Sequence, residues 1–422
     1  MKEQDKNSER FHRIMSRDGF SPDFPVRASD KSVGFMLPTL MYIFKGIRIG
    51  QLDVTLPNGE RRSFKGSDRP GLHGVLHIRD KAVGGHVLKN GEVGFGDAYL
   101  EGCWDSPDLS SLLELLYLNE PHYKGPYEKN FISRFIGWLN HKRKHNDKAN
   151  AQKNIEYHYD LGNEFYKMWL DETMAYSSGM FIKPNETLMD SQLNKFKLMY
   201  DRLDLKPEHH LLEIGSGWGG FAIYAAQRSG CRVTSITLSR EQLEEARLRA
   251  AKAEVGDRVH FELRDYRDVL ETYDRIVSIE MYEAVGEKYW PGYFAAIHKA
   301  LKPGGRAAIQ GITISPRIYD NYRSKQDFIQ KYIFPGGMLA TPEIFSAHAA
   351  VAGLKSVEPL FYAKDYADTL AGWHRNVLAA RDKIVQQFDE RFLRMWRYYL
   401  SYCEAGFRTG SIDLMQITLT KA

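Results

Sequence analysis

The second half of the chain alternates short apolar runs with amphipathic stretches. The expected strands are 210–214, 232–238, 259–263, 273–279, 307–310 and 412–419. The expected helices are 219–228, 241–254, 289–301 and further stretches between 366 and 406. Alternating β and α units predict an α/β fold, in which helices cover both faces of a mostly parallel sheet.

The first hundred residues follow a different pattern. Between residues 46 and 100, short apolar runs at 47–49, 52–56, 75–78 and 87–88 are separated by turn signals at 57–59 and 90–91. This pattern predicts a small α+β domain. A helix is expected over 109–118, with Asp108 as its N-cap.

These patterns predict four parts along the chain. They are a flexible arm over 1–30, a lipid-binding-like α+β domain over 31–125, a basic amphipathic linker helix over 126–155 and a catalytic domain over 156–422. Turn signals at 302–305 and 335–337 bracket a segment that could form a lid.

The linker combines Phe131, Phe135 and Trp138 at helical spacing with the basic run 142–144. Such a helix either lies in a lipid interface or packs on a core with a solvated basic end. The local pattern does not separate these two interpretations.

Charge and cysteine content narrow the class of protein. The net charge of the 422-residue chain is +4, which argues against a broadly basic nucleic-acid-binding protein. The three cysteines are scattered, as is typical of a reducing cytoplasm. The first ten residues are polar and the apolar stretch 35–44 contains Pro38, so we expect neither secretion nor a membrane span.

A glycine-rich turn follows the first strand of the alternating region. Gly215, Gly217 and Gly220 satisfy G-x-G-x-x-G, and Gly219 lies in the same turn. Glycines at a strand-to-helix turn allow a nucleotide-like cofactor to approach the backbone. The motif is shared by dinucleotide enzymes and methyltransferases.

Polar residues around this turn favour S-adenosylmethionine over a dinucleotide. Glu213 can receive the amino group of a methionine moiety but would repel a pyrophosphate. The second strand ends without an acidic residue for a ribose, and Thr237 and Gln242 are the polar substitutes there. Asp265 and Tyr266 can contact an adenine ring.

At this point the chain resembles the cyclopropane-fatty-acid synthase and mycolic-acid methyltransferase family. The resemblance covers most of the sequence beyond residue 35, and its most specific stretches are 157–163, 213–220, 282–286 and 330–337. It implies a class I methyltransferase (Rossmann-like) fold with a seven-stranded, mostly parallel sheet and a helical lid. It also implies that Tyr176 and Ser177 contact S-adenosylmethionine.

The resemblance assigns Glu283 and Tyr366 to a pocket that holds a bicarbonate ion, the base of the reaction, in this family. Two positions of the pocket depart from the pattern, because Ser178 replaces a cysteine and Gln310 replaces a histidine. Glu280 is an addition, at a position where cyclopropane-forming relatives carry a small residue. Glu280 is either a second proton acceptor or a structural residue that caps a helix or pairs with a basic residue.

The expected activity is methyl transfer from S-adenosylmethionine to double bonds of acyl chains in membrane phospholipids, giving cyclopropane fatty acids. Alternatives are a methyl-branched or methylene product, a soluble small-molecule substrate, and a catalytically silent lipid-surface protein. Aromatic faces would stabilise the carbocation on the acyl chain. The candidates are Tyr176, Tyr266, Tyr282, Trp290, Tyr332 and Tyr366, of which the motifs support Tyr176 and Tyr366.

The expected partner is an anionic membrane surface, reached from the cytoplasmic side as a peripheral protein. Nucleic acid is not expected as a partner, and the sequence leaves a homodimer open. No histidine or cysteine spacing typical of a metal site is present in the sequence.

Overall fold

The structure is a computed structural model that describes residues 37–123 and 161–422. The described residues divide into two compact units. The first takes residues up to 123 together with Ser324–Ile333 and Val377–Thr409, and the second takes 161–323, Phe334–Asn376 and Gly410–Ala422. The sequence patterns predict a catalytic domain that continues without interruption from 156 to 422. The predicted arm and linker helix lie outside the described residues.

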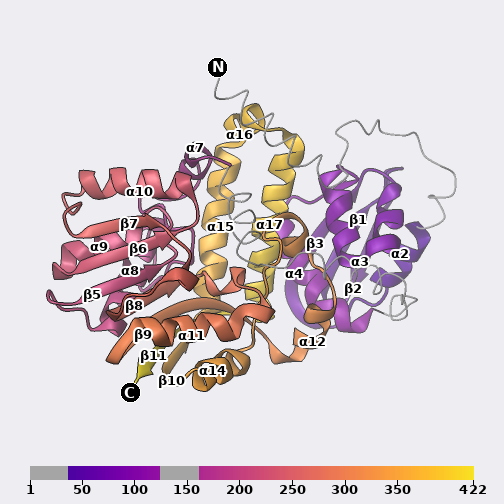
Figure 1. Cartoon of the computed structure of the whole chain (residues 1–422). Coiled ribbons are helices and arrows are strands. Elements are labelled where there is room, and N and C mark those ends of the chain that lie inside the picture. Colours follow the sequence, from indigo (N-terminus) through magenta and orange to yellow (C-terminus); the bar gives the residue numbers. More distant parts are fainter. Residues whose placement is uncertain (1–36, 124–160) are drawn as a thin grey trace. The chain divides into compact units, whose positions relative to one another are not determined.

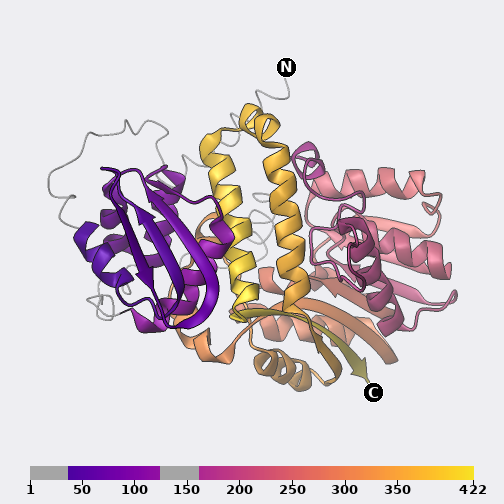
Figure 2. The same ribbon diagram turned by 180° about the vertical axis from the view of Figure 1, so that it is seen from behind.

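The first unit contains a four-stranded sheet in the order β2-β1-β3-β4. Its strands are β1 (Ile49–Thr55), β2 (Arg61–Lys65), β3 (Asp68–Ile78) and β4 (Trp104–Asp105). Its N-terminal helices are α2 (Leu37–Phe44), α3 (Ala82–Leu100), α4 (Leu109–Asn119) and the short η2 (Glu120–His122). Alternate residues of β1 are buried, so one face of the sheet packs on the helices, and Figure 2 shows the strands in front of them.

The structure differs from the sequence patterns in part of this unit. Asp108 caps α4 through its side chain, as predicted. The run 87–88 lies inside α3, because Val83, Val87 and Phe95 bury one face of a helix. The turn signal at 90–91 marks a break in that helix, where Gly91 has φ 59°. Short apolar runs fit a strand or a buried helix equally well, so their period does not decide between them.

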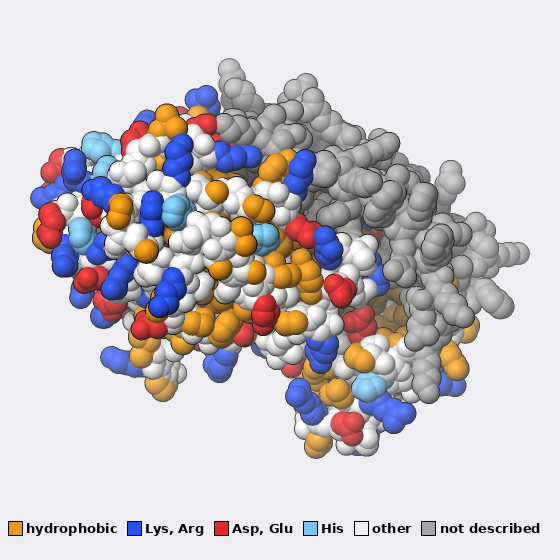
Figure 3. Space-filling model, turned by 60° about the horizontal axis from the view of Figure 1, so that its bottom comes forward, with side chains coloured by type: hydrophobic (Ala, Val, Ile, Leu, Met, Phe, Trp, Pro, Cys, Tyr) orange, Lys and Arg blue, Asp and Glu red, His pale blue; other side chains and the backbone are white. Residues whose placement is uncertain are grey.

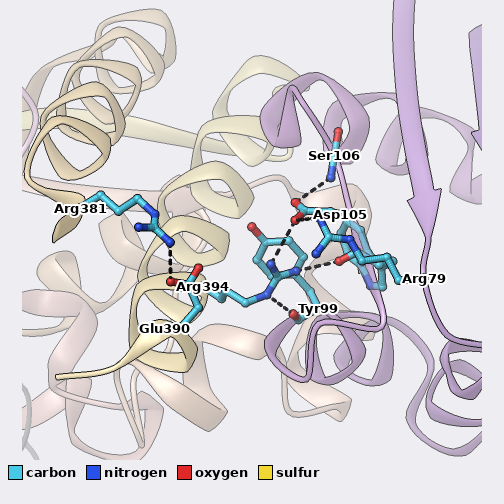
Figure 4. A network of polar contacts seen from close by, with 8 residues as sticks. Arg79, Tyr99, Asp105, Ser106, Arg381, Glu390 and Arg394 are labelled. Atoms are coloured by element: carbon cyan, nitrogen blue, oxygen red, sulfur yellow. Dashed lines mark hydrogen bonds and ion pairs between the residues drawn. The ribbon is translucent and has the colours of Figure 1, made fainter. Parts of the chain in front are cut away.

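Three helices from the C-terminal part of the chain complete the first unit. They are α13 (Phe328–Tyr332), α16 (Arg381–Gln387) and α17 (Glu390–Arg408). The Arg394 guanidinium of α17 donates to the carbonyls of Tyr99 and Trp104 at 2.6 and 2.7 Å and to the Asp105 carboxylate at 3.1 Å (Figure 4). This buried cation satisfies the end of α3 and the start of β4, and so it ties residues almost 300 positions apart into one unit.

The second unit contains a seven-stranded sheet in the order β10-β11-β9-β8-β5-β6-β7 (Figure 1). The strands are β5 (His210–Ile214), β6 (Arg232–Thr237), β7 (Val259–Leu263), β8 (Tyr273–Ile279), β9 (Leu301–Ile314), β10 (Leu354–Phe361) and β11 (Ile412–Lys421). Strands β5 to β9 are parallel, and β11 is antiparallel to both of its neighbours. The predicted mostly parallel α/β sheet is therefore confirmed.

Helices follow most of the strands of this unit. They are α7 (Asn163–Lys167), α8 (Leu188–Leu203), α9 (Gly220–Ser229), α10 (Arg240–Lys252), α11 (Trp290–Ala300), α12 (Pro316–Ser324), α14 (Pro342–Val351) and α15 (Ala363–Ala379). Three single-turn helices are η4 (Tyr266–Asp268), η5 (Tyr282–Ala284) and η6 (Glu287–Tyr289). The apolar runs of the sequence do not predict β10, and the turn signal at 302–305 lies within β9. Of the helices in the described ranges, none is long and apolar enough to cross a membrane.

Candidate active site

The glycine-rich turn connects β5 to α9 at the carboxyl edge of the parallel strands. The φ angles of Gly215, Gly217 and Gly219 are 94°, 49° and 84°, which residues other than glycine rarely adopt. A Cβ at Gly217 would meet no atom within 4 Å, whereas one at Gly219 would lie 2.9 Å from Phe261. The space at Gly217 is therefore open to a ligand, and Gly219 allows α9 to pack closely on the sheet.

Glu213, the penultimate residue of β5, has a buried carboxylate and is 2% exposed. Its Oε2 accepts a 2.5 Å hydrogen bond from the Ser235 hydroxyl, and burial raises its pKa to about 8. A carboxylate buried with so little compensation favours a cation beside it. The ammonium group of a methionine moiety fits this requirement, which supports the cofactor predicted from the sequence.

The structure brings Thr237, the last residue of β6, together with Gln242 on α10. The Thr237 hydroxyl donates to Oε1 of Gln242 at 2.9 Å. Asp265 instead forms a two-point ion pair with Arg267, at 2.8 and 2.6 Å, so its carboxylate already has a partner. Burial raises the pKa of the neighbouring Tyr266 to about 12. The Tyr266 ring lies edge-on to Tyr293.

The segment 176–178 is held from α8. Lys195, which is fully buried, donates to the Ser177 hydroxyl at 2.6 Å, and Gln192 donates to the Ser177 carbonyl at 2.7 Å. Tyr176 packs among other aromatic rings, with centroid distances of 5.3 Å to Trp169 and 5.5 Å to Trp373. These contacts fix the two residues that the family resemblance places at the cofactor.

Glu280 lies at the centre of a polar pocket just after β8. Its Oε1 accepts from the Ser178 amide at 2.9 Å and from Nε2 of Gln310 at 2.7 Å, and its Oε2 accepts from the Tyr366 hydroxyl at 2.5 Å. Three residues that the resemblance assigns to the bicarbonate pocket thus bind the Glu280 carboxylate. Burial raises the pKa of Glu280 above its usual value, and the three donors oppose that rise.

Glu280 also has an unusual backbone. Its φ is 50°, in the left-handed region that glycine prefers, and its amide donates to the Gln310 carbonyl at 2.8 Å. A glutamate in this conformation costs on the order of 1–2 kcal/mol relative to an unstrained one. Strain of this kind often accompanies a functional side chain, which favours the catalytic interpretation of Glu280 over a merely structural one.

Glu283 occupies the next single-turn helix, η5. Its Oε1 accepts a 2.5 Å hydrogen bond from the Ile312 amide, whereas its enclosed Oε2 has no hydrogen-bond partner in the described structure. Burial and the nearby Glu280 charge raise the pKa of Glu283 to about 8. Glu283 is therefore largely protonated at neutral pH, and Glu280 is the better candidate for the ionised carboxylate of the pair.

Sequence reasoning missed three residues of this site, namely Lys195, Tyr362 and Gln416. Lys195 carries a local signal, because it shares the buried face of α8 with Phe196 and Met199. Tyr362 and Gln416 carry no such signal, since only the pairing of β9 with β11 and the start of α15 bring them to Gln310. The other aromatic candidates were Tyr282, Trp290 and Tyr332. The first two stack on each other in the core, and Tyr332 contacts Asp97 in the first unit.

Comparison with known proteins agrees with this geometry. A family model described as "mycolic acid cyclopropane synthetase" matches residues 146–417, more than half of the chain. The tuberculostearic acid methyltransferase UfaA1 of Mycobacterium tuberculosis is 40% identical, over 84% of this chain and 85% of its own. The cyclopropane-fatty-acyl-phospholipid synthase of Escherichia coli K12 is 33% identical, over 79% of this chain and 85% of its own.

A solved structure supports the fold and the cofactor. The mycolic acid cyclopropane synthase CmaA1, crystallised with S-adenosylhomocysteine (SAH) and CTAB, is similar with a TM-score of 0.62 and 28% identity. The similarity covers 64% of this chain and 98% of that one. Together with the open glycine turn and the buried Glu213, these matches show that the chain is an S-adenosylmethionine-dependent class I methyltransferase and belongs to the mycolic acid cyclopropane synthetase family.

Proposed function

We propose that the protein transfers a methyl group to the double bond of an unsaturated acyl chain in a membrane phospholipid, and that Glu280 accepts the proton released afterwards. The observation that carries this proposal is the Glu280 carboxylate, which the protein itself holds in the pocket with three donors. The names of the relatives support a lipid substrate, since one is named "probable fatty acid methyltransferase" (Pseudomonas putida) and another "sphingolipid C9-methyltransferase" (Candida albicans).

S-adenosylmethionine supplies the methyl group as an electrophile when it is bound. The π electrons of the acyl double bond form the new carbon–carbon bond, and the adjacent acyl carbon becomes a cation. The aromatic rings of Tyr176 and Tyr366 can face this charge, which a desolvated ring stabilises by about 2 kcal/mol. Glu280 then removes one proton from the new methyl group and must lose it to solvent before the next turnover.

We propose a methylene-bearing chain as the product. A hydride shift from the methylated carbon to its neighbour moves the positive charge to the carbon that carries the methyl group. Proton loss from the methyl group to Glu280 then leaves a C=CH2 group on that carbon of the acyl chain. Support comes from the 40% identity to a relative named as a tuberculostearic acid methyltransferase, compared with 33% to the cyclopropane synthase. Further reduction to a methyl branch would need a separate hydride donor.

The second candidate product is the cyclopropane fatty acid. The description of the family model and the name of the Escherichia coli relative favour it. In this case no hydride shift occurs, and proton loss from the methyl group closes the ring. A bicarbonate ion as the base is less well supported, because Ser178, Gln310 and Tyr366 already bind Glu280.

The test uses purified protein, S-adenosylmethionine and vesicles of phospholipid with monounsaturated chains. Mass spectrometry should detect addition of one CH2 unit to the acyl chain. Proton NMR of the product then separates a vinylidene group from a cyclopropane ring, which have the same mass. Parallel reactions with free fatty acid and with small amines test the soluble-substrate alternative. Turnover of amines without lipid methylation would overturn the proposal.

A chemical rescue tests the role of Glu280. The Glu280→Gly variant should lose activity, and added formate or bicarbonate should restore part of it by filling the vacated carboxylate position. Glu254→Gly is the matched control, because Glu254 is also a glutamate with positive φ, 57°, at an exposed position after α10. An active Glu280→Gly enzyme without added anion would exclude Glu280 as the base.

Membrane attachment from the cytoplasmic side remains part of the proposal. Basic and acidic side chains are interspersed on the face seen in Figure 3, so this face of the described residues has no field of one sign. The basic run 142–144 and its aromatic neighbours, which lie outside the described residues, are the expected contact with anionic lipid.

A further inference from the structure

The side-chain amide of Gln310 has a fixed direction in the structure. Its Oε1 accepts two hydrogen bonds, from the Tyr362 hydroxyl at 2.9 Å and from Nε2 of Gln416 at 2.8 Å. Its Nε2 donates to Glu280 at 2.7 Å. Gln310 and Gln416 are fully buried and face each other as direct partners between β9 and β11. Neither Tyr362 nor Gln416 belongs to the pocket implied by the family resemblance.

The same direction continues toward the surface. Oε1 of Gln416 accepts from Nε of Arg202 at 3.3 Å, and Arg202 also donates to the Glu358 carbonyl at 2.9 Å. The series therefore begins at a partly buried guanidinium, which only donates, and ends at the Glu280 carboxylate. Every amide between these ends accepts on the Arg202 side and donates on the Glu280 side.

This polarity has a consequence for Gln310. If its amide rotated by half a turn, its NH2 group would meet the NH2 group of Gln416, and its oxygen would meet the Glu280 carboxylate. Both contacts are repulsive in a buried site. The amide of Gln310 consequently remains a donor to Glu280, which favours the ionised carboxylate over the protonated form.

We propose that Tyr362 and Gln416 are positioning residues for the proton-accepting step, because they lock the Gln310 amide with its NH2 group toward Glu280. This inference rests on the proposed role of Glu280 as the base, and it adds which residues keep the Glu280 carboxylate ionised. Neither residue touches the Glu280 carboxylate, and each acts through Gln310.

Other charged and titratable groups surround Glu280 and are part of the same balance. Lys195 from α8 favours the ionised form of Glu280, and the charge of Glu280 in turn raises the pKa of Glu283 on η5. Tyr366 from α15 donates directly, and the charges of Glu280 and Arg202 act in opposite directions on the pKa of Tyr362. Because Lys195, Glu283 and Tyr366 stay in place in both variants, a change in the pKa of Glu280 can be assigned to the Gln310 amide.

The variants are Tyr362→Phe, which removes only a hydroxyl, and Gln416→Met, which keeps the length of the side chain. Thr418→Val is the matched control. Thr418 lies two residues from Gln416 on the same strand and also accepts from Arg202, at 3.3 Å, but it pairs with Ala308 rather than with Gln310. Thermal unfolding and SAH binding verify that each variant is folded. If Gln416→Met does not fold, Tyr362→Phe alone suffices for the test.

Two readouts are measured as a function of pH. Infrared difference spectra follow the protonated carboxyl band of Glu280, assigned by its disappearance in Glu280→Gln, and methyl transfer to vesicle lipid gives the kcat profile. Loss of the hydrogen bond from the Gln310 amide should raise the apparent pKa of Glu280. The acid limb of the kcat profile should therefore move to higher pH, by roughly half a pH unit to one pH unit. Thr418→Val should leave both curves unchanged.

The two readouts separate the inference from the proposed function. If the Glu280 band titrates identically in wild type, Tyr362→Phe and Gln416→Met, the positioning role is overturned, even if lipid is methylated. If the band shifts as expected but the wild type does not methylate an acyl chain, the positioning role stands and the proposed function fails. A shift of equal size in Thr418→Val would also overturn the inference, since it would assign the effect to Arg202.

Discussion

The Tyr366 hydroxyl donates a 2.5 Å hydrogen bond to Oε2 of Glu280, across 86 residues of sequence. The same helix, α15, holds the 178–181 segment through Thr369 and Asp365, which accept from the amides of Gly179 and Phe181. The helix α15 therefore carries one donor to Glu280, the Tyr366 hydroxyl, and also holds the segment that supplies a second donor, the Ser178 amide. The carboxylate is fixed from two sides before any substrate is present, which is the preorganisation that proton transfer requires.

Replacement of Glu280 by glycine should separate stability from activity. Because φ at Glu280 is 50°, glycine relieves backbone strain, and we expect the unfolding free energy to stay equal or rise by about 1 kcal/mol. Activity should fall roughly 100- to 10,000-fold, the usual contribution of a general base. Thermal unfolding and a lipid methylation assay measure the two effects. A clearly destabilised Glu280→Gly protein would show that the carboxylate has a structural role instead.

Lys195 should control the pH dependence of the reaction. Burial lowers its pKa to about 8, so below that pH it is a cation near Glu213 and Glu280 and favours their ionised forms. Lys195→Met should therefore move the acid limb of kcat upward by roughly one pH unit and weaken SAH binding. Lys197→Met, on the exposed side of the same helix, is the control. Identical pH profiles for the two variants would contradict this prediction.

The Gly217→Val variant should abolish cofactor binding while the protein stays folded. A Cβ at Gly217 meets no protein atom, so the added side chain would fill only the space left for the ligand. Gly230→Val is the matched control, because Gly230 also has positive φ and open surroundings but lies at the far end of α9. Calorimetry with SAH should show loss of binding for Gly217→Val alone. Equal affinities would mean that the cofactor does not approach this turn.

Cofactor binding should release a proton through Glu213. In the free protein, burial raises the Glu213 pKa to about 8, so the carboxyl is mostly protonated at neutral pH. A ligand ammonium favours the ionised form, and affinity should consequently rise between about pH 6 and pH 8, by at most tenfold per unit. Calorimetry in two buffers with different heats of ionisation measures the released proton. Glu213→Gln should bind more weakly and release none. Proton uptake by the wild type would refute this assignment.

Charge reversal of Lys142, Arg143 and Lys144 should weaken binding to anionic vesicles. Each basic residue contributes about 1 kcal/mol near an anionic surface, so the triple variant should lose roughly two orders of magnitude in partitioning. Vesicle sedimentation at low and high salt measures the effect, with neutral phosphatidylcholine vesicles as the control. Binding that is insensitive both to salt and to the substitutions would contradict this prediction.

Local sequence patterns predicted much of the second unit. The bounds of β5, β7 and β8 in the structure are those expected from the apolar runs, and the glycine turn lies between β5 and α9 as expected. A buried parallel strand is a short continuous apolar run, and a tight turn with positive φ selects glycine. Both signals depend only on residues close in sequence, so the chain alone determines them.

Only the tertiary structure decided how the pocket is assembled. Glu280 and Gln310 were visible as departures from the family pattern, but their hydrogen bond to each other was not. Gln416 is 106 residues from Gln310 and reaches it because β11 pairs antiparallel with β9. The inclusion of α17 in the first unit depends on Arg394 in the same way. Periodicity reports which face of an element is buried, whereas the partner of a buried polar group is set by strand pairing and helix packing between distant segments.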